Sequence, residues 1–131
     1  MMAQLVYLVV VLTMVELLVF SILVGQGRTK YKVPAPATSG HPTWERLNRV
    51  HLNSLEQAVV FVPLLLVFAA TWGPGAAVVL GVIYLVARIL YAVGYVRDPA
   101  RRAAGAFLTF GVQLLLALGS IIAILGKLRQ S

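Results

Sequence analysis

The sequence predicts an all-α integral membrane protein, a single domain over residues 1–131 that folds as a four-helix bundle running up, down, up and down. Hydrophobic residues make up 60% of the chain and charged residues only 11%, whereas soluble domains are about half apolar and about a quarter charged. Mean hydropathy is correspondingly high, at +0.92. The apolar residues are concentrated in four segments of about 20 residues each, the length that crosses a bilayer.

The four helices are expected to cover about residues 3–25, 43–71, 76–96 and 104–126. The first should end at Gly25-Gln26-Gly27, because a loop with three prolines follows shortly afterwards. Thr43 is expected to cap the second helix. Gly73-Pro74-Gly75 predicts a tight turn, so that the second and third helices form an antiparallel hairpin.

The net charge of +7 indicates topology first, because basic residues of membrane proteins gather in cytoplasmic loops. The first loop with its flanking turns holds five Lys or Arg residues and the third loop three, against none in the second loop and two in the carboxyl tail. We therefore expect loops one and three in the cytoplasm and both termini outside, in the inner cell membrane. No basic motif of the nucleic-acid-binding kind is present, so nucleic acid is not an expected partner.

The chain has no cysteine, which excludes disulfides and a protein thiol as nucleophile. Any thiol chemistry must therefore use a thiol that a ligand brings. A metal site is not expected either, because His41 and His51 are ten residues apart and lack the spacing of metal ligands.

A row of polar side chains follows the start of the second helix. At 100° per residue its members fall within about one third of the helix circumference; they are Glu45, Arg46, Arg49, Asn53, Glu56 and Gln57. Charges that run into an apolar segment are costly in a bilayer and need a partner. The row therefore predicts a binding surface.

The third helix carries a second stripe, formed by Tyr84, Arg88, Tyr91 and Tyr95. Tyrosines are common at membrane interfaces, but Arg88 lies about two turns inside the span and must face protein or water. Its candidate counter-ions within the spans are Glu16 and Glu56, and both a structural ion pair and a ligand contact fit it. Gln113 in the fourth helix is expected to form an interhelical hydrogen bond.

Arginines, tyrosines, one amide and one carboxylate together suit a small organic anion with several charges. Arginine binds carboxylates in a bidentate manner, while the amide and the carboxylate can take up amide and ammonium groups. A guanidinium or tyrosine hydroxyl beside a ligand thiol would stabilise its thiolate.

At these residues the sequence resembles a known family, the membrane-associated proteins in eicosanoid and glutathione metabolism (MAPEG). Its members include leukotriene C4 synthase, microsomal glutathione transferases and prostaglandin E synthase. ERLNRVHLNSLE (Glu45–Glu56) looks like the family's E-R-x-x-R-x-x-x-N-x-x-E signature, and ARILYAVGY followed by RDPARR (Ala87–Arg102) is similar to leukotriene C4 synthase. Gln57 departs from that enzyme, which has a tyrosine there, and leaves the lipid-substrate pocket unassigned.

The resemblance implies a homotrimer that binds glutathione as co-substrate between neighbouring subunits, with no metal. It assigns the ligand to Arg28, Arg46, Arg49, Asn53 and Glu56 on the one hand, and to Arg88, Tyr91 and Tyr95 of the adjoining subunit on the other. Arg102 is expected to activate the thiol, with Arg101 as the alternative. The implied activity is a glutathione transferase or peroxidase of detoxification that acts on a lipophilic substrate drawn from the lipid bilayer.

Two other functions remain open from the sequence. Glu16 in the first helix is the feature that a small proton-coupled multidrug transporter would use, although the strong charge bias of the loops argues against such a transporter. The chain could also be a non-catalytic relative that binds a lipid or a partner protein, because retained arginines and tyrosines favour catalysis without proving it.

Overall fold

The protein is an all-helical bundle, described over residues 1–131 by a computed structural model. Its elements are α1 (Met2–Lys30), α2 (Pro42–Trp72), α3 (Pro74–Arg97), the short 3₁₀ helix η1 (Pro99–Arg102) and α4 (Ala103–Gln130). All four long helices are long and apolar enough to cross a membrane, with α4 counted together with η1. The prediction of a four-helix membrane bundle is confirmed.

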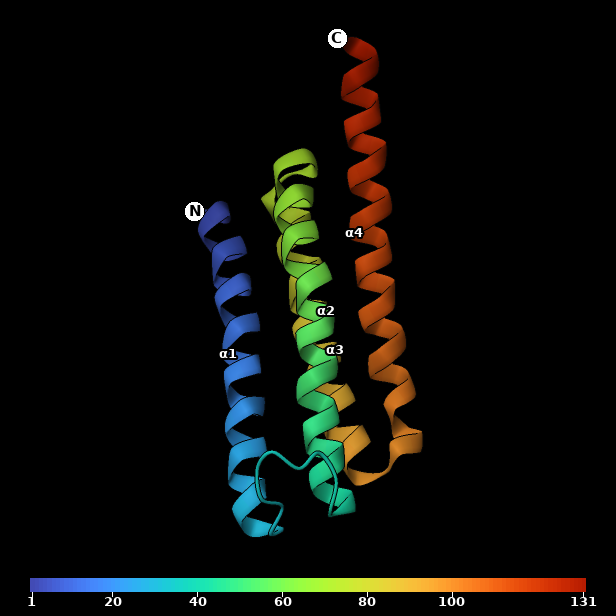
Figure 1. Ribbon diagram of the computed structural model, residues 1–131. Helices are drawn as coiled ribbons and strands as arrows, with labels where there is room; N and C mark the ends of the chain where they lie inside the picture. The colour runs from blue at the N-terminus through green and yellow to red at the C-terminus, as the bar shows by residue number, and fades with distance from the viewer.

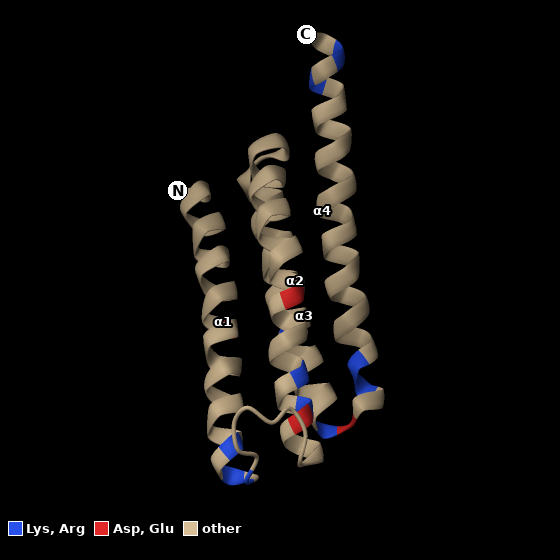
Figure 2. Cartoon of the chain, viewed as in Figure 1, with Lys and Arg blue, Asp and Glu red and all other residues tan.

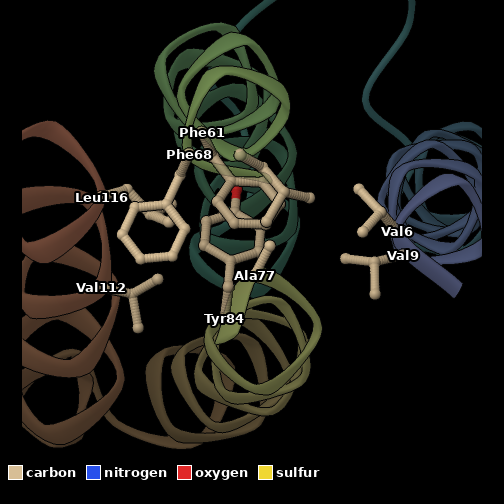
Figure 3. Close-up of a cluster of buried hydrophobic side chains, with 9 residues drawn as sticks. Val6, Val9, Phe61, Phe68, Ala77, Tyr84, Val112 and Leu116 are labelled. Carbon is tan, nitrogen blue, oxygen red and sulfur yellow. The ribbon is translucent and has the colours of Figure 1, made fainter. Parts of the chain in front are cut away.

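The central pair of helices is α2 and α3, with α1 packed on one side of the pair and α4 on the other (Figures 1 and 3). The chain alternates in direction, so α1 runs parallel to α3. Both termini lie at the same end of the bundle, and there α4 extends well beyond the other helices (Figure 1). Because α1 and α4 do not pack on each other, each leaves a broad apolar face for lipid or for another protein.

The prediction that the first helix ends near residue 25 is wrong, because α1 continues to Lys30. Its last two turns are held by contacts from outside the helix. The indole nitrogen of Trp44 donates to the Val24 carbonyl at 3.1 Å. Arg28 donates to the Ala37 carbonyl at 2.8 Å, and its guanidinium carbon lies 4.4 Å from the centre of the Trp44 ring. These contacts offset the low helix propensity of Gly25 and Gly27 in these two turns.

The predicted cap at Thr43 is also wrong by two residues. The capping residue of α2 is His41, whose backbone is extended and whose Nδ1 accepts a hydrogen bond from the Thr43 backbone nitrogen at 3.2 Å. Pro42 occupies the first helical position, where its missing N–H is not needed. The His41 ring also stacks on Tyr31, with centroids 4.3 Å apart.

The tight turn between the second and third helices is confirmed. A single non-helical residue, Gly73, separates α2 from α3, and its φ of 106° lies in the region that favours glycine. Pro74 then starts α3. The short connection makes the two central helices antiparallel neighbours.

The apolar core lies between all four helices (Figure 3). At its centre Phe61 of α2 and Tyr84 of α3 stack with ring centroids 3.6 Å apart. Val6 and Val9 approach this pair from α1, and Val112 and Leu116 from α4. Tyr84 is therefore part of the core and does not continue the polar stripe to which its spacing assigned it.

Charged residues gather at the end of the bundle that holds the α1–α2 and α3–α4 connections, here called the basic end (Figure 2). Its Lys and Arg residues are Arg28, Lys30, Lys32, Arg46, Arg49, Arg97, Arg101 and Arg102. Only Lys127 and Arg129 lie at the opposite end. The remaining basic residue, Arg88, is inside the bundle.

Near the basic end, α3 and α4 approach each other more closely than side chains would allow. A Cβ atom on Gly105 of α4 would overlap the backbone nitrogen of Tyr91 and would lie 2.7 Å from the carbonyl oxygen of Ala87. Only glycine fits this contact. It sets the spacing of the two helices where the polar residues of α3 face α4.

Gly105→Ala should destabilise the fold by about 1–3 kcal/mol, because the added methyl group must push two backbones apart. Gly111→Ala in the same helix is the matched control, since a Cβ there meets no atom within 4 Å. The control should be neutral or slightly stabilising, because alanine is the better helix former. Thermal unfolding in detergent checks both variants, and equal stability of the two would contradict the close contact.

Candidate functional site

A cavity of about 370 Å³ opens near the basic end between α2, α3 and α4. Its lining comes from three helices and from η1: Arg49, Asn53, Gln57, Arg88, Tyr91, Tyr95, Arg102, Ala106, Thr109 and Phe110. Three of these side chains are cationic and none is acidic. The volume lies within the range of small-molecule sites, about 300–1,000 Å³.

Arg88 forms the floor of this cavity. The side chain is only 1% exposed. Its Nη2 donates to Asn53 Oδ1 and to Ser54 Oγ, both at 2.8 Å, and its Nη1 donates to Thr109 Oγ1 at 3.4 Å. A buried guanidinium is thus held by neutral acceptors from α2 and α4, and no carboxylate is among its hydrogen-bond partners.

Two tyrosines continue from Arg88 towards the basic end along α3. The guanidinium carbon of Arg88 lies 4.4 Å from the centre of the Tyr91 ring, a distance at which a cation is attracted to the ring face. Tyr91 and Tyr95 stack in turn, with centroids 5.6 Å apart and ring planes within 5°. The stripe predicted from the spacing therefore forms a continuous wall from Arg88 to Tyr95.

Arg102 reaches the cavity from η1. This short helix begins after Asp98, whose side chain accepts a hydrogen bond from the Ala100 backbone nitrogen at 3.0 Å. Arg102 lines the cavity, whereas Arg101 does not. The backbone of Arg101 instead packs on Gly94 of α3, where a Cβ would lie 2.6 Å from its carbonyl oxygen.

Three predicted ligand residues lie outside the cavity. Arg46 Nη1 donates to the carbonyl of Val96 at 3.2 Å, which ties α2 to the end of α3. Arg28 holds the α1–α2 loop. Glu56 is exposed on α2 and is absent from the lining. The cavity within one chain, in contrast, already joins Arg49 and Asn53 to the α3 residues that the resemblance assigned to an adjoining subunit.

Several lining residues escaped the sequence reasoning, because short polar or apolar side chains in a membrane helix carry no strong signal. Thr109, Ala106 and Phe110 of α4 close the cavity opposite α2. Gln57 is oriented by Gln113, whose Nε2 donates to Gln57 Oε1 at 3.0 Å and to its backbone carbonyl at 3.2 Å. The interhelical hydrogen bond predicted for Gln113 is confirmed.

The hydrogen bonds determine which polar groups remain free for a ligand. Asn53 uses its carbonyl oxygen for Arg88, and Gln57 uses its carbonyl oxygen for Gln113. Both amides can therefore offer N–H donors to the cavity. Together with the exposed guanidinium groups of Arg49 and Arg102 they make a site rich in donors, suited to carboxylates and other anionic groups.

The chain is similar in sequence to several known proteins. Residues 6–122 match the MAPEG family. An uncharacterized protein of Synechocystis sp. is 42% identical over 113 residues, covering 86% of this chain and 82% of that protein. Microsomal glutathione S-transferase 2 of Homo sapiens is 35% identical over 99 residues (76% and 67%). Leukotriene C4 synthase of Bos taurus is 32% identical over 124 residues (85% and 83%).

Ser54→Ala should lower the free energy of unfolding by about 1.5–3 kcal/mol, because it removes one acceptor from a buried charge. Thr71→Ala is the control: its hydroxyl donates to the carbonyl of Val67 within its own helix at the exposed end of α2, so its loss should cost little. Equilibrium unfolding in mixed micelles measures both changes. A Ser54→Ala variant as stable as the control would show that the hydroxyl does not support Arg88.

Proposed function

The chain belongs to the MAPEG family, and from this we propose that it is a membrane-bound glutathione transferase that also reduces lipid hydroperoxides. Membership of a family with glutathione S-transferases and leukotriene C4 synthase among its relatives supports a glutathione-related enzyme. Four apolar helices make it a multi-pass membrane protein. The transfer reaction, the substrate and the roles of individual residues are our proposal.

The observation that carries the proposal is the cavity itself, with three arginines, two tyrosines and two amides but no acidic side chain in its lining. Glutathione has two carboxylates, one ammonium group and a thiol, so it is a net anion. A cavity of one sign attracts a ligand of the other and holds its carboxylates by charge-assisted hydrogen bonds.

The proposed binding roles follow from position. Arg49 is exposed on α2 and is free to form a bidentate pair with one carboxylate. Asn53 is fixed by Arg88 and offers its N–H groups. Tyr91 and Tyr95 supply an aromatic wall with hydroxyl groups. Both Nη atoms of Arg88 are held by protein acceptors, so its part is the positive potential at the floor of the cavity.

Arg102 is proposed to stabilise the thiolate of glutathione, because it is the exposed cation of the lining that lies next to α4. The thiol proton leaves to solvent, and the sulfur lone pair then attacks the electrophilic carbon of a lipophilic substrate. A carbon–sulfur bond forms while the leaving group departs with its bonding electrons. With a hydroperoxide, the sulfur attacks the O–O bond, an alcohol leaves, and a second glutathione reduces the resulting sulfenic acid to a disulfide with loss of water.

A homotrimer with the basic end in the cytoplasm completes the proposal. The charge bias of the loops supports this orientation, with eight basic residues at the basic end and two at the other. Arg28, Arg46 and Glu56 lie outside the cavity of their own subunit and could reach a ligand only in an assembly. The transporter alternative loses support, since the family match leaves its one indication, Glu16, without a transporter fold around it.

Purified protein in detergent or nanodiscs should bind glutathione, and Arg49→Ala should weaken the binding about tenfold to a hundredfold, as expected for the loss of a hydrogen-bonded charge. Arg129→Ala is the control, because Arg129 lies at the opposite end of the bundle. Isothermal titration calorimetry compares the three proteins. If the wild type does not bind glutathione, the proposed function is wrong.

Arg102→Leu should abolish the thiolate absorbance that appears when glutathione is added to the wild type, and with it conjugation to a chlorinated aromatic. The reason is that an uncompensated thiolate is unfavourable near an apolar wall. Arg101→Leu should leave both signals largely unchanged, because Arg101 is outside the cavity. Glutathione binding without any thiolate signal in the wild type would indicate a non-catalytic relative instead.

A further inference from the structure

Three buried side-chain atoms have no hydrogen-bond partner in this bundle: Ser120 Oγ and two atoms that belong to groups of opposite charge. One is Nε of Arg88, and the other is Oε2 of Glu16 in the middle of α1. Polar groups buried in low dielectric are almost always paired, directly or through an ordered water. The unpaired atoms of these two residues therefore need an explanation, and the binding roles proposed above do not give one.

The packing register of α1 against α3 places these two residues side by side. The two helices run parallel, and the Met2 side chain lies 3.5 Å from the Cβ position of Gly75. One further contact joins Val9 to Gly81, where a Cβ would lie 2.6 Å from Val9 Cγ1. Seven residues beyond this contact on both helices, the register reaches Glu16 on α1 and Arg88 on α3.

The neighbours of Glu16 agree with this register. Glu16 lines a groove between α1 and α3 together with Leu85 and Ile89, which precede and follow Arg88 on α3. Every other residue of that groove is apolar: Leu12, Val15, Val19 and Phe20 complete it. The groove offers the carboxylate no polar partner, so its compensation must come from the interior of the bundle.

No other acidic residue can compensate Arg88 from within the spans. The chain has only four, and Glu45 and Asp98 lie at the basic end. Glu56 is exposed on α2 and outside the cavity. A single carboxylate and a single guanidinium inside a membrane are each costly alone, and each is the natural partner of the other.

We propose that Glu16 is the buried counter-ion of Arg88 and that one ordered water joins the two side chains. This water accepts a hydrogen bond from Nε–H of Arg88 and donates one to Oε2 of Glu16. Each of the three guanidinium nitrogens of Arg88 then has a partner: Nη2 on α2, Nη1 on α4 and Nε towards α1. The ion pair ties α1, the helix that contributes nothing to the cavity, to the residue that forms the cavity floor.

Through this pair Glu16 becomes a positioning residue for the site, a consequence that rests on the proposed function. The Nη2 atom of Arg88 holds Asn53 Oδ1 and thereby turns the Asn53 N–H groups towards the ligand. Without Glu16, one side of the guanidinium is uncompensated, and the side chain is free to rotate away from Asn53. Glu16 thus influences ligand binding without touching the ligand.

The ion pair is tested by a double-mutant cycle on stability, which needs no ligand. Glu16→Gln and Arg88→Met should each destabilise the protein, and the double variant should be more stable than the sum of the two losses predicts. We expect a coupling of about tenfold in the unfolding equilibrium constant, within the range for residues in one network. The same cycle with Glu56→Gln in place of Glu16→Gln should be additive. An additive Glu16 cycle would overturn the proposal.

The positioning role is tested by glutathione titration of Glu16→Gln and Glu16→Asp. Glu16→Gln should weaken binding about fivefold, as typical for a residue that acts through a network. Glu16→Asp keeps the charge and should recover most of the affinity, which a purely steric role of the side chain would not produce. Coupled stability with unchanged affinity in Glu16→Gln would refute the positioning role. If the stability cycle shows coupling but the wild-type protein does not bind glutathione, the proposed function is refuted and the ion pair is still supported.

Discussion

The structure depends on satisfying one buried guanidinium. Arg88 is almost completely buried in the interior of the bundle, so its neighbours must supply acceptors. Asn53 and Ser54 do so from α2 and Thr109 from α4, while Tyr91 stacks below it on its own helix. The same side chain therefore joins three helices and contributes, with Arg49 and Arg102, to the positive charge of the cavity between them. A neutral residue would leave these acceptors free to rearrange and the cavity without its positive floor.

The fold follows from the sequence because membrane burial leaves few alternatives. Four apolar segments and one Gly-Pro-Gly turn define an antiparallel bundle, since backbone polar groups must be satisfied within each helix. Helix ends are different, because contacts made elsewhere decide them. The last two turns of α1 depend on Trp44 from α2 and on Arg28, which donates to a loop carbonyl. Local helix propensity does not include such contacts, and it therefore predicted that the helix ends at its glycines.

Helical periodicity predicted some residues of the site correctly and misassigned others, because it gives only the direction of each side chain. A helical wheel gives the direction of a side chain but not its neighbour, so Tyr84 shared the stripe of Arg88 and yet stacks on Phe61 in the core. The polar row of α2 likewise covers a third of the helix, which is wider than one cavity wall. Arg49 and Asn53 reach the cavity, whereas Glu56 faces outward. The α4 wall escaped prediction altogether, because the close approach at Gly105 depends on three-dimensional packing.

The placement of charge across the bundle explains why the cavity can stay positive. A carboxylate inside the cavity would neutralise Arg88 but would also cancel the attraction for an anionic ligand. A counter-ion on α1 compensates the guanidinium from the side that faces away from the cavity, because α1 contributes no residue to the lining. The ligand would then meet only the cationic side chains of the cavity. Glu56, the acidic residue of the polar row that lies within the span, is exposed on α2 and therefore does not compensate Arg88. Glu16 of α1, which suggested a transporter on sequence grounds, meets both requirements: it compensates Arg88 and leaves the cavity without a carboxylate.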